Sequence, residues 1–252
     1  MKVDLNADLG ESFGPWVTGD DMSMLDLVTS ANVACGGHAG DPETMFETLR
    51  AASVRGVSVG AHPGFADREG FGRRVIPMPA AEIGRLVAAQ VGALTGIAAL
   101  AGAEVRYVKP HGALGNLAAD DRAVAEAIVG AVAALPGRLA ILAISGTVLE
   151  QLARAAGVPV YSEIFADRAY LPNGRLVPRS REGAMLHDAD EAAERLIRFL
   201  DSGRMPVLGG DPIPLSAQSV CVHGDSPGAV VMAQQVRSGL ERAGVTVAPF
   251  MS

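Results

Sequence analysis

The chain has 252 residues, of which 49% are hydrophobic and 19% are charged, and this composition excludes an intrinsically disordered protein. Its 28 acidic residues outnumber the 21 lysines and arginines, and the net charge of −7 argues against a nucleic-acid partner and against an anionic membrane surface. The length suits a single α/β barrel domain. The two cysteines are far apart and predict a reducing, cytoplasmic environment without a disulfide framework.

Short β-rich runs alternate with longer helical patterns along the chain. The predicted strands are 3–9, 31–35, 57–61, 105–109, 139–144, 158–164 and 220–223. The predicted helices are 42–55, 79–101, 121–135, 147–156, 188–202 and 226–243. Two insertions, 169–179 and 206–215, carry Gly-containing turn signals and predict β-hairpins. We expect no signal peptide, and the stretch 86–105 is rich in Ala and Gly, which favours a buried helix over a membrane span.

The alternation predicts one domain, residues 1–252, with a parallel sheet and helices outside it. Because side chains alternate between the two faces of a strand, Asp4, Asn6 and Asp8 share one face of the first strand, and its apolar residues share the other. Similar polar faces recur in later strands. A strand in an open, doubly wound sheet is apolar on both faces, so this pattern favours a closed barrel with a polar interior.

Four of the five histidines follow the end of a predicted strand: His38, His62, His111 and His223. The carboxyl ends of parallel strands converge on one edge of a β/α fold, where active sites lie. We therefore expect these four side chains to lie at a single site. Each also has a glycine nearby, which permits a tight turn and close approach of the backbone to a ligand.

Several charged residues are expected at the same edge. The acids are Asp8, Glu11, Asp41, Glu163, Asp167 and Asp225. The arginines that follow strands, and that can hold a carboxylate or a phosphoryl group, are Arg73, Arg74, Arg168 and Arg179. Lys109 is one of only two lysines in the chain and ends a predicted strand, which favours a specific need for an ammonium group. Carboxylates and imidazoles together suit either general acid–base catalysis or a divalent metal that activates water, and the spacing alone leaves both open.

Some motifs are absent from the sequence. It contains no GxxxxGK[ST] phosphate loop, no GxGxxG after a strand and no GxSxG nucleophile elbow. Cys35 shares the parity of the apolar residues Ala31 and Val33, so we interpret it as a small core residue and not as a nucleophile.

Six ordered blocks in the sequence resemble the signature of one protein family. The blocks are DLNADLGESFG, ANVACGGHAGDP, GAHPGF with GFGRR, VKPHGAL, EIFADRAY with GRLVPRS, and CVHGDSPG, and they span residues 4 to 228. They are similar to those of the LamB/YcsF family, which supplies one component of a bacterial ATP-dependent 5-oxoprolinase. The resemblance implies a distorted seven-stranded parallel β/α barrel related to glycoside hydrolases and deacetylases. It also implies that the 5-oxo-L-proline lactam is opened to L-glutamate with ATP hydrolysis, together with 5-oxoprolinase subunits B and C.

We assign roles to residues on this basis. The predicted catalytic residues are Asp8, His62, Lys109, His111 and His223. The predicted substrate-binding residues are Asn6, Glu11, His38, Arg73, Glu163, Asp167, Arg168, Arg179 and Asp225. ATP is expected to bind mainly to the partner subunits, because this chain has no phosphate loop. Two alternatives stay open: a metal-dependent carbohydrate or amide deacetylase on a similar barrel, and a non-catalytic subunit that binds substrate.

Overall fold

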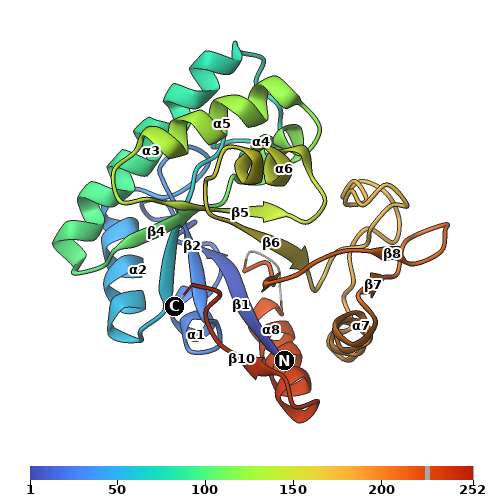
Figure 1. The fold of residues 1–252 in the computed structure, drawn as a ribbon. Coiled ribbons are helices and arrows are strands. Elements are labelled where there is room, and N and C mark those ends of the chain that lie inside the picture. The colour runs from blue at the N-terminus through green and yellow to red at the C-terminus, as the bar shows by residue number, and fades with distance from the viewer. Residues whose placement is uncertain (225–227, 252) are drawn as a thin grey trace.

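Seven parallel strands form a closed barrel in the computed structural model, which describes residues 1–224 and 228–251 (Figure 1). The barrel strands, in order around the barrel, are β1 (Lys2–Leu9), β2 (Ser30–Ala34), β3 (Ser58–His62), β4 (Val105–Val108), β5 (Ala140–Ile144), β6 (Val160–Phe165) and β9 (Ser219–Cys221). The barrel closes because β9 pairs with both β6 and β1. A short strand, β10 (Thr246–Val247), adds to the beginning of β1. The closed, all-parallel topology confirms the predicted fold class.

Helices cover the outside of the barrel. They are α1 (Asp21–Leu25), α2 (Pro42–Val54), α3 (Ala80–Ala101), α4 (Gly112–Ala118), α5 (Arg122–Ala134), α6 (Val148–Ala155), α7 (Ala189–Ser202) and α8 (Ala229–Arg242). The side chain of Asp41 accepts hydrogen bonds from Glu43 and Thr44 and so caps α2, as its position before Pro42 predicts. The predicted cap of α8 at Ser226 lies outside the described residues.

The side chains inside the barrel form polar and apolar layers. The outward-facing residues of β1, such as Leu5, pack with the helices in the main hydrophobic core. Towards the amino ends of the strands, the interior is filled by an apolar cluster that includes Tyr107, and the ring of Phe250 near the chain end lies 5.0 Å from the Tyr107 ring between centroids. Gly60 makes room for the tyrosine ring, because a Cβ there would lie 2.2 Å from it. Polar residues are also present near the amino ends, where Asp4 accepts hydrogen bonds from Ser30 and Ser219. Asp8, Lys109 and Glu163 lie nearer the carboxyl ends of their strands.

The two predicted hairpins are confirmed in outline. Tyr170 and Leu176 form an antiparallel bridge around the Asn173-Gly174 turn. The strands β7 (Arg204–Met205) and β8 (Ile213–Pro214) pair antiparallel and project to one side of the barrel (Figure 1).

Helix α3 is long and apolar enough to cross a membrane when judged by length and composition alone. In the structure it packs between α2 and α5 and buries one face, which includes Ile83, Val87 and Leu94. The prediction of a buried helix is therefore correct for one face only, because the other is rich in small residues and exposed.

Candidate active site at the mouth of the barrel

The ammonium of Lys109 occupies the centre of the barrel just after β4. Its Nζ lies 2.8 Å from Glu163 Oε1, 2.9 Å from Asp8 Oδ1 and 3.1 Å from Cys221 Sγ. All four side chains are buried and come from four different strands or strand ends. A lysine in this position gives the two buried carboxylates a shared counter-charge.

These neighbours set the charge state of each group. Burial alone would lower the pKa of Lys109, but Asp8 and Glu163 outweigh it and hold that pKa well above the usual value. Burial would raise the pKa of Asp8, but His62 and Lys109 keep it well below its usual value. The pKa of Glu163 is raised, mainly by burial, although Lys109 opposes this. Near neutral pH the centre therefore holds an ammonium beside the firmly ionised Asp8 and the more basic carboxyl of Glu163.

A layer of amides beneath Lys109 fixes the two carboxylates. Asn6 donates to Glu163 Oε1 at 3.0 Å, and Asn32 donates to Asp8 Oδ1 at 2.8 Å. Asn32 also donates to Asn6 Oδ1 at 2.7 Å, and its own Oδ1 accepts from the hydroxyl of Tyr107 at 2.7 Å. Because these hydrogen bonds link several strands, the carboxylates above have little freedom to rotate.

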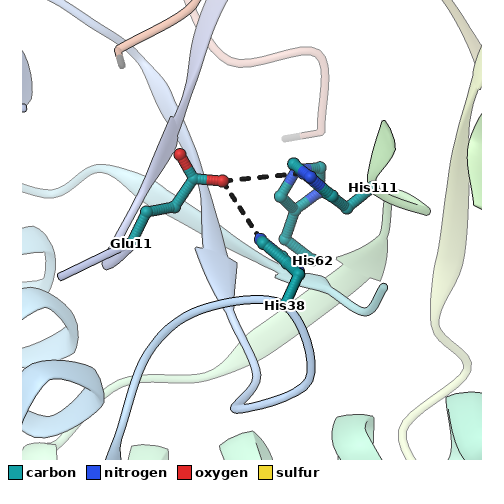
Figure 2. A group of neighbouring side chains, drawn as sticks. All are labelled: Glu11, His38, His62 and His111. Carbon is teal, nitrogen blue, oxygen red and sulfur yellow. Dashed lines mark hydrogen bonds and ion pairs between the residues drawn. The ribbon is translucent and has the colours of Figure 1, made fainter. Parts of the chain in front are cut away.

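Three histidines and Glu11 gather on one side of the mouth (Figure 2). The rings of His38 and His111 stack at 3.6 Å between centroids, and His62 meets both edge-on. Glu11 Oε1 lies 3.1 Å from His38 Nε2 and 3.5 Å from His111 Nδ1. Each residue offers one ligand atom, and these four atoms lie within 4.8 Å of one another, so this group has the composition of a metal site.

The loop after β3 holds the histidines in place. Gly72 has a φ of +63° and lies so close to the rings that a Cβ would be 2.6 Å from His38 and 2.9 Å from His111. Only glycine combines that conformation with that proximity. The preceding residue, Phe71, packs edge-on against both rings and accepts a hydrogen bond from His111 through its carbonyl.

His223 and Asp167 form a pair on the other side of the mouth. His223 Nδ1 lies 2.9 Å from both carboxylate oxygens of Asp167. Burial would raise the pKa of Asp167, but His223 lowers it below the usual value, so the carboxylate stays ionised. This arrangement fixes the tautomer and leaves Nε2 of His223 to exchange a proton with a bound molecule.

A buried arginine supports the segment that carries Asp167. Arg195 on α7 donates to the carbonyls of Phe165, Ala166 and Arg168 at 2.7–2.8 Å. It therefore holds the loop after β6 in one conformation, and with it the carboxylate that faces His223.

A cavity of about 440 Å³ opens between the two groups of side chains. Its wall includes Lys109 and the arginines Arg73, Arg168 and Arg179. Arg168 is buried, its Nη2 donates to the carbonyl of Val177, and its Nε has no hydrogen-bond partner within the described residues. Burial and the nearby Arg179 lower the pKa of Arg168 to about 10, so it remains charged at neutral pH. The cavity suits a small polar molecule that carries a carboxylate.

Comparison with known proteins identifies the family. The sequence model described as the LamB/YcsF family matches residues 3–252. The chain belongs to the LamB/YcsF family. A relative from Gluconobacter oxydans (strain 621H), named as the A subunit of 5-oxoprolinase, is 54% identical over 97% of this chain and 96% of its own length. A second relative with that name, from Rhodopseudomonas palustris (strain ATCC BAA-98 / CGA009), is 50% identical over 99% of both chains. The crystal structure of a lactam utilization protein from Thermus thermophilus superposes with a TM-score of 0.92 at 45% identity, over 98% of this chain and 99% of that one.

Most of the predicted site residues of this LamB/YcsF chain meet at the cavity. The predicted residues that line it are Asp8, Glu11, His62, Arg73, Lys109, His111, Glu163, Arg168, Arg179 and His223. Three others contact that lining from behind: Asn6 beneath Lys109, His38 behind His111, and Asp167 behind His223. Asp225 lies outside the described residues.

Three residues singled out in the sequence have local roles instead. Asp41 caps α2, and Arg74 forms an ion pair with Asp67, so neither is part of the cavity wall. Cys35 is buried in the core, and burial raises the pKa of its thiol to about 12, as expected for a core residue.

Three contributors to the site were not predicted. Asn32 lies in a predicted strand on the polar parity, so the alternation pattern was sufficient to find it. Phe71 carries no local signal, because its role depends on the loop conformation. Arg195 lies in an amphipathic helix and looks like any surface arginine until its three carbonyl partners are known.

Proposed function

We propose that this chain is the A subunit of a multisubunit 5-oxoprolinase and that the lactam ring opens in the cavity at the mouth of its barrel. The observation that carries the proposal is the set of relatives that bear the name of this 5-oxoprolinase component and are about half identical over nearly the full length. The arginines in the cavity wall support it independently, because 5-oxo-L-proline is a small cyclic amide with one carboxylate. The two buried, free cysteines fit a cytoplasmic complex.

The arginines provide a way to bind the carboxylate of 5-oxo-L-proline. Arg168 brings a buried, charged guanidinium to the cavity wall with one donor atom unused. A guanidinium can donate two parallel hydrogen bonds to a carboxylate, and this fixes the orientation of the ring. Held in this way, the amide of the substrate can face the opposite side, where Lys109 lies.

His223 is suited to act as the general base. Once the lactam oxygen has been phosphorylated, water adds to the ring carbon that bears it, the C–N bond breaks, and the nitrogen takes a proton to become the amine of γ-glutamyl phosphate. A second water then hydrolyses this acyl phosphate to glutamate and phosphate. His223 Nε2 can take the proton from water and later return it to the nitrogen, while Asp167 stabilises the charged ring. Lys109 supplies positive charge beside the phosphorylated oxygen, and Asp8 and Glu163 hold the ammonium in place.

We assign the ATP chemistry to partner subunits B and C. An unstrained lactam is slow to hydrolyse, and phosphorylation of its oxygen by ATP creates a far better electrophile. The sequence lacks the Gly-rich loop with lysine that binds phosphates, and a net charge of −7 gives no general attraction for a nucleotide. In this division of labour the barrel receives the activated lactam and completes its opening, so that glutamate, ADP and phosphate are the products.

Reconstitution tests this proposal. The full chain is mixed with purified B and C subunits, and glutamate is quantified after addition of 5-oxo-L-proline and ATP. We expect glutamate only when all three subunits are present. Absence of glutamate with all three would overturn the function, and release of acetate from an N-acetylated sugar by the chain alone would favour the deacetylase alternative. Glutamate formed by this chain alone with ATP would overturn the division of labour.

A further inference from the structure

In the cluster of Glu11, His38, His62 and His111, two ring nitrogens face each other closely, and a bound cation would remove the repulsion between them (Figure 2). His62 Nδ1 lies 2.7 Å from the carbonyl oxygen of Lys109, and His111 Nε2 lies 2.8 Å from that of Phe71. A carbonyl only accepts, so these two ring nitrogens carry the hydrogens. In neutral rings the remaining nitrogens, His62 Nε2 and His111 Nδ1, then both hold lone pairs, yet they lie only 2.9 Å apart.

Two lone pairs at that distance repel each other unless a proton or a metal ion lies between or beside them. His62 Nε2 also lies 3.3 Å from Asp8 Oδ2, so a cation at this point is flanked by the carboxylates of Asp8 and Glu11. Neutral imidazoles are the form that binds metals.

Three of the six separations between the ligand atoms also fit one ion. Ligand atoms held about 2.0–2.1 Å from a tetrahedral zinc lie roughly 3.3 Å from one another. The neighbouring ligand atoms here are separated by 2.9 Å (His62 to His111), 3.1 Å (His38 to Glu11) and 3.5 Å (His111 to Glu11). The carbonyl groups that accept from His62 and His111 orient the two rings in the manner typical of metal-binding histidines.

We propose that Glu11, His38, His62 and His111 bind one divalent first-row transition metal ion at the mouth of the barrel. Three imidazole nitrogens and one carboxylate oxygen favour zinc and its neighbours over magnesium or calcium, which prefer oxygen ligands. Glu11, His62 and His111 line the cavity, so the ion is accessible to a bound substrate. Such an ion would polarise a carbonyl oxygen or activate water. This catalytic use rests on the proposed function, whereas the binding site rests on the geometry alone.

Metal binding is measured on the full chain without partners or substrate, so the result is independent of the oxoprolinase reaction. The protein is stripped with EDTA and titrated with Co²⁺, and the visible absorption of tetrahedral cobalt is followed. In parallel, zinc content after dialysis is measured by mass spectrometry. We expect one ion per chain in the wild type.

Variants assign the ion to this cluster. His38→Gln and Glu11→Gln should each weaken cobalt binding at least tenfold, by analogy with the ~10–100-fold cost of losing an outer-shell partner. His187→Gln is the matched control, because His187 is exposed at the start of α7 and should keep full binding. Circular dichroism checks that each variant is folded, and Glu11→Gln, which changes only one atom, gives a second test if His38→Gln unfolds. Substoichiometric metal in the wild type, or equal binding by folded variants and wild type, would overturn the proposal.

Discussion

Replacement of Lys109 by methionine tests how the centre of the barrel is stabilised. Methionine fills much of the same space but removes the ammonium that lies 2.9 Å from Asp8 and 2.8 Å from Glu163. The two carboxylates are left buried and without their ammonium partner, since only 9% of the Asp8 side chain and 1% of the Glu163 side chain are exposed. Removal of one partner from a buried ion pair typically costs about 3–5 kcal/mol. We expect a loss of that size in the free energy of unfolding near pH 7.5.

The loss should depend on pH. Burial already raises the pKa of Glu163 in the wild type, and without Lys109 that pKa rises further. An acid whose folded-state pKa is raised stabilises the fold less as the pH increases, because the folded state must give up a proton that it binds tightly. The penalty of Lys109→Met should therefore be smaller at pH 5.5 than at pH 7.5. Adding Glu163→Gln should recover part of it, about 1–3 kcal/mol, because the second buried charge is removed.

Urea unfolding followed by far-ultraviolet circular dichroism measures these differences. Lys2→Met is the matched control, because Lys2 is the only other lysine and is exposed, and it should change stability by less than about 0.5 kcal/mol. Lys109→Arg keeps the charge but not the compact shape, so glutamate formation by the reconstituted complex should still fall roughly tenfold or more. A loss of less than about 1 kcal/mol for Lys109→Met at both pH values would refute the proposed role of Lys109 as the buried counter-charge.

Three further substitutions probe other parts of the barrel. Asp8→Asn removes the charge that faces Lys109, and turnover of the reconstituted complex should fall about 100-fold or more while circular dichroism stays unchanged. Arg168→Lys should raise the KM for 5-oxo-L-proline about tenfold with a smaller change in kcat, because lysine lacks the planar guanidinium fork. Steady-state kinetics measures both constants, and a fall in kcat as large as the rise in KM would contradict this role. Burial raises the pKa of Asp4 from 3.8 to about 6, so the folded wild type loses about 2 kcal/mol of stability between pH 4 and pH 7 relative to Asp4→Asn. Urea unfolding at the two pH values should show that difference, and parallel pH profiles for both proteins would contradict it.

Much of the fold was predictable because its signal is local and repeated. The ends of the seven predicted strands lie within about two residues of the observed ends. Short apolar runs between helical patterns seldom form anything other than strands. The polar parity of Asp4, Asn6 and Asp8 predicted a closed barrel, and all three are buried inside it. The short elements α1, α4 and β10 were missed, because a segment of seven residues or fewer carries too little periodicity to be recognised.

The sequence predicted which residues lie at the site, but not which of their side chains contact one another. Strand topology alone brings His38, His62, His111 and His223 to one edge, and the structure confirms that they lie there. That His38 stacks on His111, and that His223 faces Asp167, depends on loop conformations that no spacing encodes. The close packing of the histidines further requires Gly72, whose role is visible only once the rings are in place.

The measurement that tests the central proposal most directly is glutamate formation by a complex reconstituted with His223→Asn. Asn cannot act as a general base at this position, and His187→Asn provides an exposed control. If the lactam ring opens at the mouth of this barrel, glutamate formation falls by about 10²–10⁴-fold while the affinity of the complex for ATP is unchanged. Glutamate formation within a few-fold of the wild-type rate would contradict the placement of the reaction in this chain.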